Sequence, residues 1–568
     1  MKSFRNLSFV FFTFFLTLNK IDAASSEPVF GENGMVVCTS KLASEIGIEV
    51  LKKGGNAIDA AVAIGFALSV TSSSNGNLGG GGFLVAVMPD GEKFSLDFRE
   101  KAPASATKNM FLDDKDEVLN GLSLNSLASS GVPGSVDGLL KVLKDYGSGK
   151  ISRRQILAPA IRLANNGFPL SHHEARRLNI YKDFFMKNEE ASKIFVRRDG
   201  KPWRSGDKLI QKDLARTLRK ISTHGRSGFY EGDVADLIVK EMKNGNGIIT
   251  YKDLENYSSK YRTPVQGNFH DYEILSMGPP SSGGVLLINM LNMLENFRLD
   301  TLGWNSSNYV HLLTEVERRA YADRAEHLGD PDFWNVPTST LISKKYALSR
   351  IKNISLKNAT PSTSVFPLKN TSDESIETTH YSVVDSYGSA VSVTTTINLS
   401  YGSGIVVTGA GFFLNNEMDD FSSKPGQPNA FDLIGNEANS IQPGKRPLSS
   451  MTPTIVLKNG KPSLVIGSPG GSTIITTTMQ VILNVVVFGM DIKEAVCSPR
   501  FHSQWYPDLI MIEPRGLSKD VMKNLNLMGH KIVPYKWGYI GEANGIYINK
   551  DGFFGGGDDR GETSAIGY

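Results

Sequence analysis

The sequence predicts a layered domain of mixed helices and strands, with one sheet or two stacked sheets covered by helices. Helix and strand signals occur together on both sides of a single polar linker, which favours one layered domain over separate helical and strand domains. The chain is 568 residues long, 40% hydrophobic and of mean hydropathy −0.18, as in soluble globular proteins. Its 56 glycines indicate many tight turns or close backbone approaches.

The first 23 residues have the pattern of an export signal. Two basic residues, Lys2 and Arg5, precede an apolar run over residues 9–18, and small residues follow at Ala23 and Ala24. The run is about half the ~20 residues that a membrane-spanning helix needs. We therefore expect residues 1–23 to be a signal peptide rather than an uncleaved anchor, with no stable membrane span, and the protein to be periplasmic or secreted.

Charge and cysteine content exclude several classes of function. The formal net charge is +3, and most of that excess lies in the export signal, so the body carries no concentrated basic patch for nucleic acid. Cys38 and Cys497 are the two cysteines, which excludes a disulfide scaffold and leaves a single bridge open. No Cys/His spacing suits zinc, so neither a metal nor a cofactor is predicted. His172 and His173 precede Glu174 on what reads as a solvated helix face.

Two helices are predicted near the start of the chain. Leu42, Ile46 and Val50 follow helical spacing, and glycines at 54 and 55 end that helix. Asn56 can cap a second helix over residues 57–70. This second helix is small and apolar on nearly every side, so we expect it to be buried against a sheet.

The glycine-rich loop at residues 76–82 is not a phosphate-binding loop. No Gly-Lys-Ser/Thr follows it, and residues 83–88 read as a strand rather than a helix. A hairpin with Asp90-Gly91 at its turn comes next, and Arg99 lies at the far end of its second strand.

A polar linker interrupts the second half of the predicted domain. Residues 151–350 read as mainly helical and are expected to cover a sheet, whereas residues 353–377 carry almost no periodicity. Strand signals, a long loop and a strand-turn-helix unit at 467–487 follow. A break of this kind inside one compact domain is explained if the chain is cut there.

The segments TTHYSVVD and SAVSVTTTIN after the linker predict a hairpin. Asp385 and Gly388 suit the first and fourth positions of its turn, with the glycine left-handed. Counting outward places Thr378 opposite Thr396, with Asn398 on the diagonal. One face of the hairpin is then apolar and the other carries small polar groups, which a strand could also simply present to water.

Thr378 stands where the linker meets the first strand of this hairpin. A threonine hydroxyl is a poor nucleophile without a neighbouring base, and His380, two residues along the strand, has no evident carboxylate partner. Cleavage before Thr378 would supply a base, because the freed α-amino group has a reference pKa of about 7.7 to 8.0. The sequence therefore predicts a self-cleaving enzyme with an N-terminal threonine.

Separated motifs extend this prediction to a family. In order they are GGNAIDAAVAIG at 54–65, LDFREKAP at 96–103, TTHYSVVD at 378–385, LNNEMDDFS at 414–422, KRPLSSMTPT at 445–454 and GSPGGS at 467–472. With these motifs the chain resembles the bacterial-type γ-glutamyltransferases of the N-terminal-nucleophile hydrolase superfamily, from about residue 36 to 568.

The resemblance implies a four-layer αββα fold of class α+β, with two stacked, mainly antiparallel sheets. It also implies that the precursor is cut between Glu377 and Thr378. A large subunit, residues 24–377 with its linker at 353–377, and a small subunit, residues 378–568, would then remain in one globular domain.

The same resemblance assigns roles to residues. Thr378 would be the nucleophile, Thr396 would hydrogen-bond its amine, and the backbone N–H groups of Gly470 and Gly471 would form the oxyanion hole. Arg99 would hold the donor's α-carboxylate, a task that suits a planar guanidinium. The remaining matches bind the donor's α-amino group or lie beside its carboxylate: Asn398, Glu417, Asp420, Ser449 and Ser450.

Two positions depart from the usual pattern of the family. Glu417 stands where Gln is frequent, which adds negative charge at the ammonium end of the pocket. Phe431 replaces the usual tyrosine at the tip of a lid loop, residues 422–445, and so lacks a hydroxyl. We expect the first change to tune donor binding and the second to make the lid open more readily.

The resemblance implies a γ-glutamyltransferase and glutathione hydrolase. Its substrates would be glutathione and other γ-glutamyl compounds, with amino acids or dipeptides as acceptors. A related self-cleaving amidase, of the cephalosporin-acylase or poly-γ-glutamate type, is an alternative that Arg99 and Asp420 disfavour, because neither would be paired by a donor lacking the amino-acid head. A non-catalytic secreted binding protein is disfavoured by the intact Thr378 and Gly470-Gly471.

Overall fold

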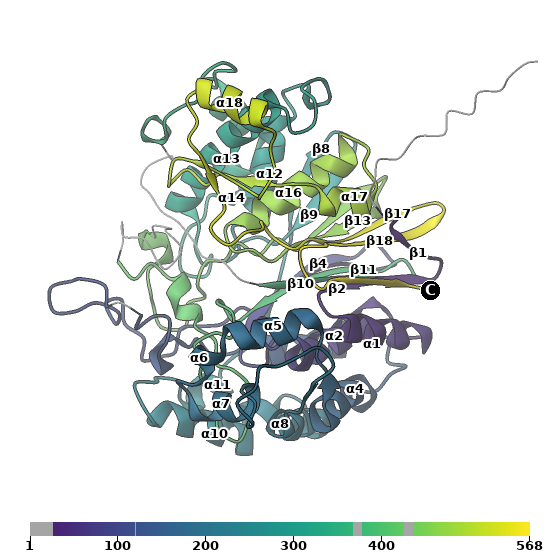
Figure 1. Ribbon diagram of the computed structural model, residues 1–568, viewed down its shortest axis with the longest axis vertical. Helices are drawn as coiled ribbons and strands as arrows, with labels where there is room; N and C mark the ends of the chain where they lie inside the picture. Colours follow the sequence, from purple (N-terminus) through teal and green to yellow (C-terminus); the bar gives the residue numbers. More distant parts are fainter. Residues whose placement is uncertain (1–25, 120, 367–377, 425–435) are drawn as a thin grey trace, which may run out of the picture.

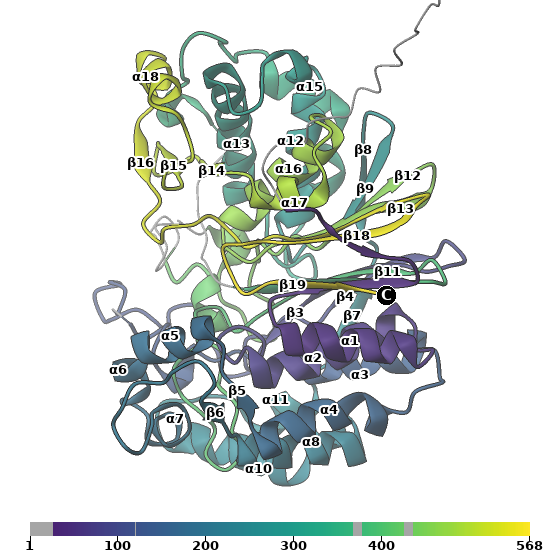
Figure 2. The same cartoon turned by 45° about the vertical axis from the view of Figure 1, so that its right-hand side comes forward.

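The computed structural model describes residues 26–119, 121–366, 378–424 and 436–568. Two seven-stranded sheets lie face to face, and helices cover the outer face of each, as Figures 1 and 2 show. The predicted four-layer αββα fold is confirmed. The predicted export signal, Glu377 and Phe431 lie outside the described residues. Within the described ranges no helix is long and apolar enough to cross a bilayer.

The first sheet has the order β19-β2-β10-β11-β3-β4-β7, and every neighbouring pair is antiparallel. Its strands are β19 (Ser564–Gly567), β2 (Gly34–Cys38), β10 (Thr379–Asp385), β11 (Ala390–Thr396), β3 (Gly81–Val87), β4 (Lys93–Asp97) and β7 (Lys260–Arg262). Strands from both sides of the predicted cut are therefore interleaved in this sheet.

The second sheet has the order β1-β18-β17-β13-β12-β9-β8 and is also antiparallel throughout. Its strands are β1 (Val29–Gly31), β18 (Gly552–Gly557), β17 (Asn544–Asn549), β13 (Lys461–Ile466), β12 (Thr454–Lys458), β9 (Tyr272–Ser276) and β8 (Val265–Phe269). A smaller sheet contains β14 (Phe501–His502), β15 (Ile510–Ile512) and β16 (Ile532–Pro534). Another contains β5 (Phe168–Pro169) and β6 (Lys208–Leu209).

The helices form two groups, one on each side of the stacked sheets (Figure 2). On the side of the first sheet lie α1 (Lys41–Lys52), α2 (Ala57–Thr71), α3 (Ser135–Tyr146), α4 (Arg153–Asn166), α5 (His172–Ile180), α6 (Lys182–Phe185), α7 (Glu189–Phe195), α8 (Lys212–His224), α9 (Ser227–Tyr230), α10 (Gly232–Lys243) and α11 (Tyr251–Glu255). On the side of the second sheet lie α12 (Gly283–Leu294), α13 (Ser307–His327), α14 (Thr338–Leu341), α15 (Lys344–Ile351), α16 (Thr473–Val486), α17 (Ile492–Cys497) and α18 (Lys519–Leu527).

Strand β2 shows how the layers share the apolar residues. Val36 and Cys38 pack into the core between the first sheet and its helices, whereas Met35 and Val37 pack into the core between the two sheets. Successive side chains of a strand point to opposite faces, so a strand buried on both sides is apolar at every position. The second sheet has its own core with the helices on its outer face.

The two helices predicted after the export signal are confirmed. Gly54 has φ of +88° between the first two helices, a conformation that favours glycine. Asn56 caps α2, its side chain accepting a hydrogen bond from the N–H of Asp59 at 3.0 Å while Asp59 accepts from the N–H of Asn56 at 2.9 Å. As predicted, α2 is buried on nearly every side and packs against the first sheet.

The predicted hairpin register is also confirmed. Thr379 pairs with Thr395 and Val384 with Ala390. Gly388 has φ of +99°, and the Asp385 carboxylate accepts the N–H groups of the turn, including that of Ser389 at 2.9 Å. The polar face of the hairpin does not meet water, because it is buried against the second sheet.

The structure refines one expectation, answers a question that the sequence left open and corrects a third point. The span 151–350 is mainly helical but also contains β7, β8 and β9, whose short polar-interrupted sequences hide the alternation of a strand. Cys38 and Cys497, whose pairing the sequence left open, are both free. Helix α5 exposes His172, as expected, but His173 and Glu174 are half-buried rather than solvated.

Candidate active site

Thr378 lies immediately before β10, at the end of the first sheet. It is 4% exposed, and its carbonyl oxygen accepts a hydrogen bond from Asn75 Nδ2 at 3.2 Å. Because Thr379 pairs with Thr395, Thr378 comes level with Thr396 on β11. The hydroxyl oxygen of Thr396 accepts the N–H of Asn398 at 2.8 Å. These contacts hold the end of the hairpin in one arrangement.

A small buried cavity brings most of the predicted site residues together. Those that line it are Arg99, Thr378, Thr396, Asn398, Glu417, Asp420, Ser449, Ser450 and Gly471. They come from the end of β4, the hairpin, the loop after β11, the loop before β12 and the loop before α16. Gly470 lines an adjoining groove, which Thr378 also reaches.

The guanidinium of Arg99 is fixed from several sides. Its Nε and Nη2 donate to the carbonyl oxygens of Pro447 and Leu448 at 3.3 and 3.2 Å. Its two Nη atoms form ion pairs with Glu417 and Asp420, which lie on the short helical turn η4 (Glu417–Asp420). Arg99 is 1% exposed, so its side chain is held in place inside the protein rather than at a surface strand end.

Glu100 is a third acid at this arginine, and the sequence analysis did not assign it a role. Its Oε2 lies 3.6 Å from Arg99 Nη1, and it is completely buried. Burial raises the pKa of Glu100 to about 7 despite the nearby guanidinium, and burial likewise raises the pKa of Glu417 well above its usual value. Three carboxyl groups thus lie at the guanidinium of Arg99, and two of them, those of Glu417 and Asp420, line the cavity. The signal in the sequence was its place beside Arg99 in the LDFREKAP segment.

The amide of Asn398 closes another side of the cavity. Asn398 has φ of +70°, which turns the chain sharply after β11. Its Nδ2 donates to the carbonyl oxygen of Asn416 at 2.9 Å, next to Glu417. The hairpin and η4 are therefore joined at the base of the cavity.

Gly470 and Gly471 form the turn between β13 and α16. Their φ angles are +133° and +58°, so both residues adopt backbone conformations that disfavour other side chains. A Cβ on Gly470 would lie 2.5 Å from Thr473 Oγ1. The turn precedes the N-terminus of α16, where N–H groups and the helix dipole favour negative charge. Backbone N–H groups in such a turn suit a developing oxyanion.

His380 does not supply a base for Thr378. Its ring nitrogens contact Thr394 Oγ1 at 2.9 Å and Ser382 Oγ at 3.1 Å, and burial lowers its pKa to about 3. The imidazole is therefore neutral, and it packs against Gly467. It supports the hairpin and the loop of Gly470 rather than taking a proton.

The adjoining groove has a volume of about 570 Å³. Thr378 and Gly470 line it, together with three acids, Glu174, Glu542 and Glu562. Glu174 lies on α5, Glu542 lies just before β17, and Glu562 lies in the loop between β18 and β19. No local sequence pattern links positions so far apart, and the sequence analysis missed them.

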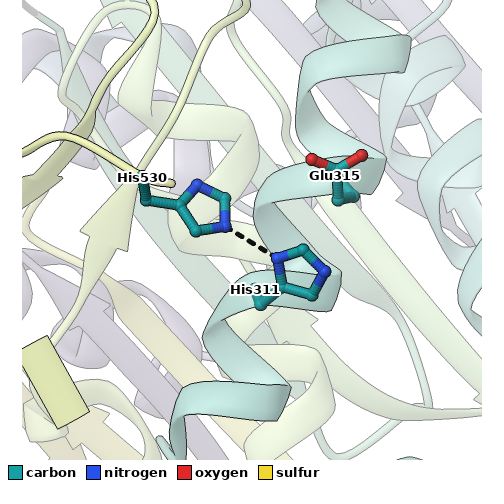
Figure 3. Close-up of side chains that lie close together, drawn as sticks. All are labelled: His311, Glu315 and His530. Carbon is teal, nitrogen blue, oxygen red and sulfur yellow. Dashed lines mark hydrogen bonds between the residues drawn. The ribbon is translucent and has the colours of Figure 1, made fainter. Parts of the chain in front are cut away.

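One other cluster among the described residues has the composition of a metal site. Ligand atoms of His311, Glu315 and His530 lie within 4.8 Å of one another (Figure 3). His311 Nδ1 is 2.7 Å from His530 Nε2, and His311 Nε2 is 2.7 Å from the carbonyl oxygen of Ser355. Glu315 already accepts from Arg319 and from the backbone N–H of Thr360. The ligand atoms are thus engaged, and the cluster joins α13 to the described part of the linker.

The described part of the predicted linker is anchored rather than loose. Ser362 donates its N–H to Asp508 Oδ2 at 2.6 Å, and Trp505 Nε1 donates to the carbonyl oxygen of Ser362 at 3.0 Å. The N–H of Ala359 donates to the carbonyl oxygen of Met528 at 2.7 Å. Ala359 and Ser362, in the described part of the linker, therefore bind residues that follow the predicted cut.

Comparisons with known proteins identify the family of the chain. The γ-glutamyltranspeptidase family model matches residues 43–568. The glutathione hydrolase proenzyme of Pseudomonas sp. strain A14 is 46% identical over 561 residues, covering 97% of this chain and 97% of that protein. Among solved structures, the γ-glutamyltranspeptidase of Helicobacter pylori is 46% identical and covers 60% of this chain and 97% of its own, with a TM-score of 0.58.

A cephalosporin acylase from Bacillus halodurans has the same fold over nearly the whole chain. It superimposes with a TM-score of 0.84 at 25% identity, covering 98% of this chain and 99% of its own. The fold is thus shared between transferases and acylases, whereas the higher identities are to glutathione hydrolases. The chain belongs to the γ-glutamyltranspeptidase family.

Proposed function

We propose that the chain cuts itself before Thr378 and that the new N-terminal threonine performs the γ-glutamyl transfer and glutathione hydrolysis of its family. The observation that carries this proposal is the place of Thr378. It borders both the cavity of Arg99 and the groove beside Gly470. A nucleophile at that junction lies between a pocket for an amino-acid head and a site for a leaving or attacking group.

The charges of the cavity suit the α-amino-acid head of a γ-glutamyl donor. Arg99 is paired with Glu417 and Asp420, and Glu100 lies beside it. A zwitterion can enter by exchange: its carboxylate takes the place of an acid at Arg99, and its ammonium takes the place of Arg99 at the acids. Each buried charge keeps a partner of opposite sign throughout, which avoids the large penalty for an unpaired buried charge.

The chemistry then requires a base, an oxyanion site and a second substrate. The α-amino group of Thr378 takes the hydroxyl proton, and Oγ attacks the γ-carbonyl carbon. The N–H groups of Gly470 and Gly471 stabilise the oxyanion. The amide C–N bond breaks, the leaving amine takes the proton, and an ester to Thr378 remains. Water or an amine acceptor then attacks this ester and frees the hydroxyl.

Cleavage would produce a large subunit of residues 24–377 and a small subunit of residues 378–568. Their association is supported by the interleaved strands, since β10 and β11 lie between β2 and β3. Glutathione and amino-acid or dipeptide acceptors are the substrates that we propose. Export through the signal at residues 1–23 would place the enzyme outside the cytoplasm.

An acylase that accepts donors without an α-amino group is the alternative, since the fold also occurs in a cephalosporin acylase. Matched anilides separate the two. γ-Glutamyl-p-nitroanilide and glutaryl-p-nitroanilide differ only in the α-amino group that Glu417 and Asp420 would hold. A strong preference for the γ-glutamyl compound supports the proposal, and equal or better use of the glutaryl compound would reassign the protein as an acylase. Release from neither would favour a non-catalytic binding protein.

A further inference from the structure

The groove beside Thr378 lies next to the reacting carbon of the proposed reaction. Thr378 and Gly470 line it, while Arg99 and Glu417 line the separate small cavity. When the donor's amino-acid head occupies the small cavity, the groove is left for the leaving group and for the amine that replaces it. Its chemistry therefore bears on acceptor choice.

One wall of the groove carries an excess of acid. Glu174, Glu542 and Glu562 line it, and Arg177 is a cation whose charge acts on Glu174 and Glu542. Arg560 also lines the groove, but its guanidinium is paired with Glu513 and Asp558.

His173 does not correct this imbalance. Burial, followed by neighbouring arginines, lowers the pKa of His173, so the ring is neutral near pH 7. A cationic ligand would balance the excess of acidic side chains on this wall.

Glu542 has an incomplete set of hydrogen bonds. Its Oε1 is buried and has no hydrogen-bond partner among the described residues. Its backbone N–H donates to Ser468 Oγ at 2.9 Å, which fixes it beside the loop of Gly470. Burial and the neighbouring acids raise the pKa of Glu542 to about 8, and burial raises that of Glu174 to about 7. A cation in the groove would relieve both the missing partner and the mutual repulsion.

The mouth of the groove is aromatic. Trp537 and Tyr539 are 61% and 57% exposed, and Tyr181 and Phe184 also line the groove. Aromatic faces pack against aliphatic stems and attract cations. A flexible chain that ends in a positive group matches this combination of apolar mouth and acidic wall.

We propose that this groove is the acceptor site and that it selects amino acids with a cationic side chain, which lies against Glu542 and Glu562. The inference rests on the proposed γ-glutamyl transfer. In the step concerned, the acceptor's neutral α-amine attacks the acyl carbon of the Thr378 ester and forms the new amide bond. The ester C–O bond breaks, and the proton lost by the amine returns to Thr378 Oγ by way of the α-amino group.

Arginine and citrulline provide a matched test, because they have nearly the same shape and differ in charge. With γ-glutamyl-p-nitroanilide as donor, kcat/KM for formation of each γ-glutamyl product is measured by mass spectrometry. We expect wild-type enzyme to favour arginine by about tenfold, the effect of one charge-assisted hydrogen bond. Glu542→Gln and Glu562→Gln should each shrink this ratio at least threefold. Glu45→Gln, an exposed acid on α1, should leave it unchanged.

The ratio cancels any general loss of activity in a variant, and processing into two subunits shows that a variant folds. If Glu542→Gln is not processed, Glu562→Gln decides the result. A wild-type ratio near one, or a ratio unchanged in the processed variants, overturns the acceptor site. Failure of wild-type enzyme to release nitroaniline would instead overturn the proposed function itself.

Discussion

Arg99 and Glu417 form an ion pair in which each side chain is 1% exposed. A buried ion pair contributes little net stability, because desolvation of both charges offsets their attraction, but removing one partner is strongly destabilising. Asp420 and Glu100 lie at the same guanidinium, so acid exceeds base there. The arrangement is explained as a receptor for a group that carries both charges, rather than as a device that stabilises the fold.

Arg99→Lys tests this receptor. An ammonium cannot reproduce the planar two-point contact with a carboxylate. We therefore expect the transition state for a γ-glutamyl donor to lose about 2 kcal/mol or more of stabilisation, which lowers kcat/KM roughly thirtyfold. Arg298→Lys, at a side chain that is 79% exposed, is the matched control. An unchanged kcat/KM in Arg99→Lys would remove Arg99 from donor binding.

Glu417→Gln tests the acidic side of the same cavity. Burial raises the pKa of Glu417, so raising the pH ionises the carboxyl and improves its contact with the donor's ammonium. We expect the wild-type KM for the donor to fall as the pH is raised above the usual titration range of a glutamate, and the fall to be smaller in the Gln variant. Identical pH profiles of KM in the two proteins would show that Glu417 does not contact the ammonium.

Gly470→Ala tests the oxyanion turn. The new Cβ would lie 2.5 Å from Thr473 Oγ1 and 3.2 Å from the Cα of Gly541, so the turn must shift. We expect kcat to fall at least tenfold, since loss of one oxyanion donor typically costs more than that. Gly489→Ala is the control, because Gly489 also has positive φ but has open space around its Cα. Equal kcat values in the two variants would separate Gly470 from the chemistry.

His530→Asn tests the histidine pair of Figure 3 as a source of acid sensitivity. Burial, then His311 and Arg318, lowers the pKa of His530 to about 4, with Glu315 and Asp508 acting in the opposite direction. The unfolded chain, with a histidine pKa near 6.5, binds the proton first. This group therefore stabilises the fold fully above about pH 6.5, and that stability is lost as the pH falls toward 4.

The expected slope for His530 is about 1.4 kcal/mol per pH unit in this window. Thermal unfolding at pH 7.5 and 5.0 should show a smaller acid-induced fall in Tm for His530→Asn than for wild type. The exposed His172→Asn should behave as wild type. A fall in Tm as large in His530→Asn as in wild type would contradict this origin of acid sensitivity.

The sequence pattern was sufficient for elements that depend on residues close together in the chain. The hairpin register follows from alternation and from the Asp385–Gly388 turn, and the start of α2 follows from Asn56. Strands β8 and β9 were missed because their pairing with each other and with β12 decides them, not their own pattern. Propensity is weak in short strands, where tertiary contacts outweigh it.

The active site, too, could be predicted only in part from the sequence. Most positions that the resemblance assigned line one cavity, but the role of Glu100 appears only from its 3.6 Å distance to Arg99. The groove could not be predicted, because its acids, Glu174 and Glu542, lie on segments hundreds of residues apart. Burial also decides their charge state, and no sequence pattern reports the burial of a single carboxyl group.

The central claim, that Thr378 is both the cutting residue and the nucleophile, is tested most directly by the intact mass and N-terminal sequence of purified Thr378→Ala. Thr379→Ala, the next residue on β10, is the control. We predict that wild type and Thr379→Ala yield a fragment beginning at residue 378, and that Thr378→Ala remains one uncut chain that releases no nitroaniline. A fragment beginning at residue 378 in the Thr378→Ala protein would contradict self-cleavage by this threonine.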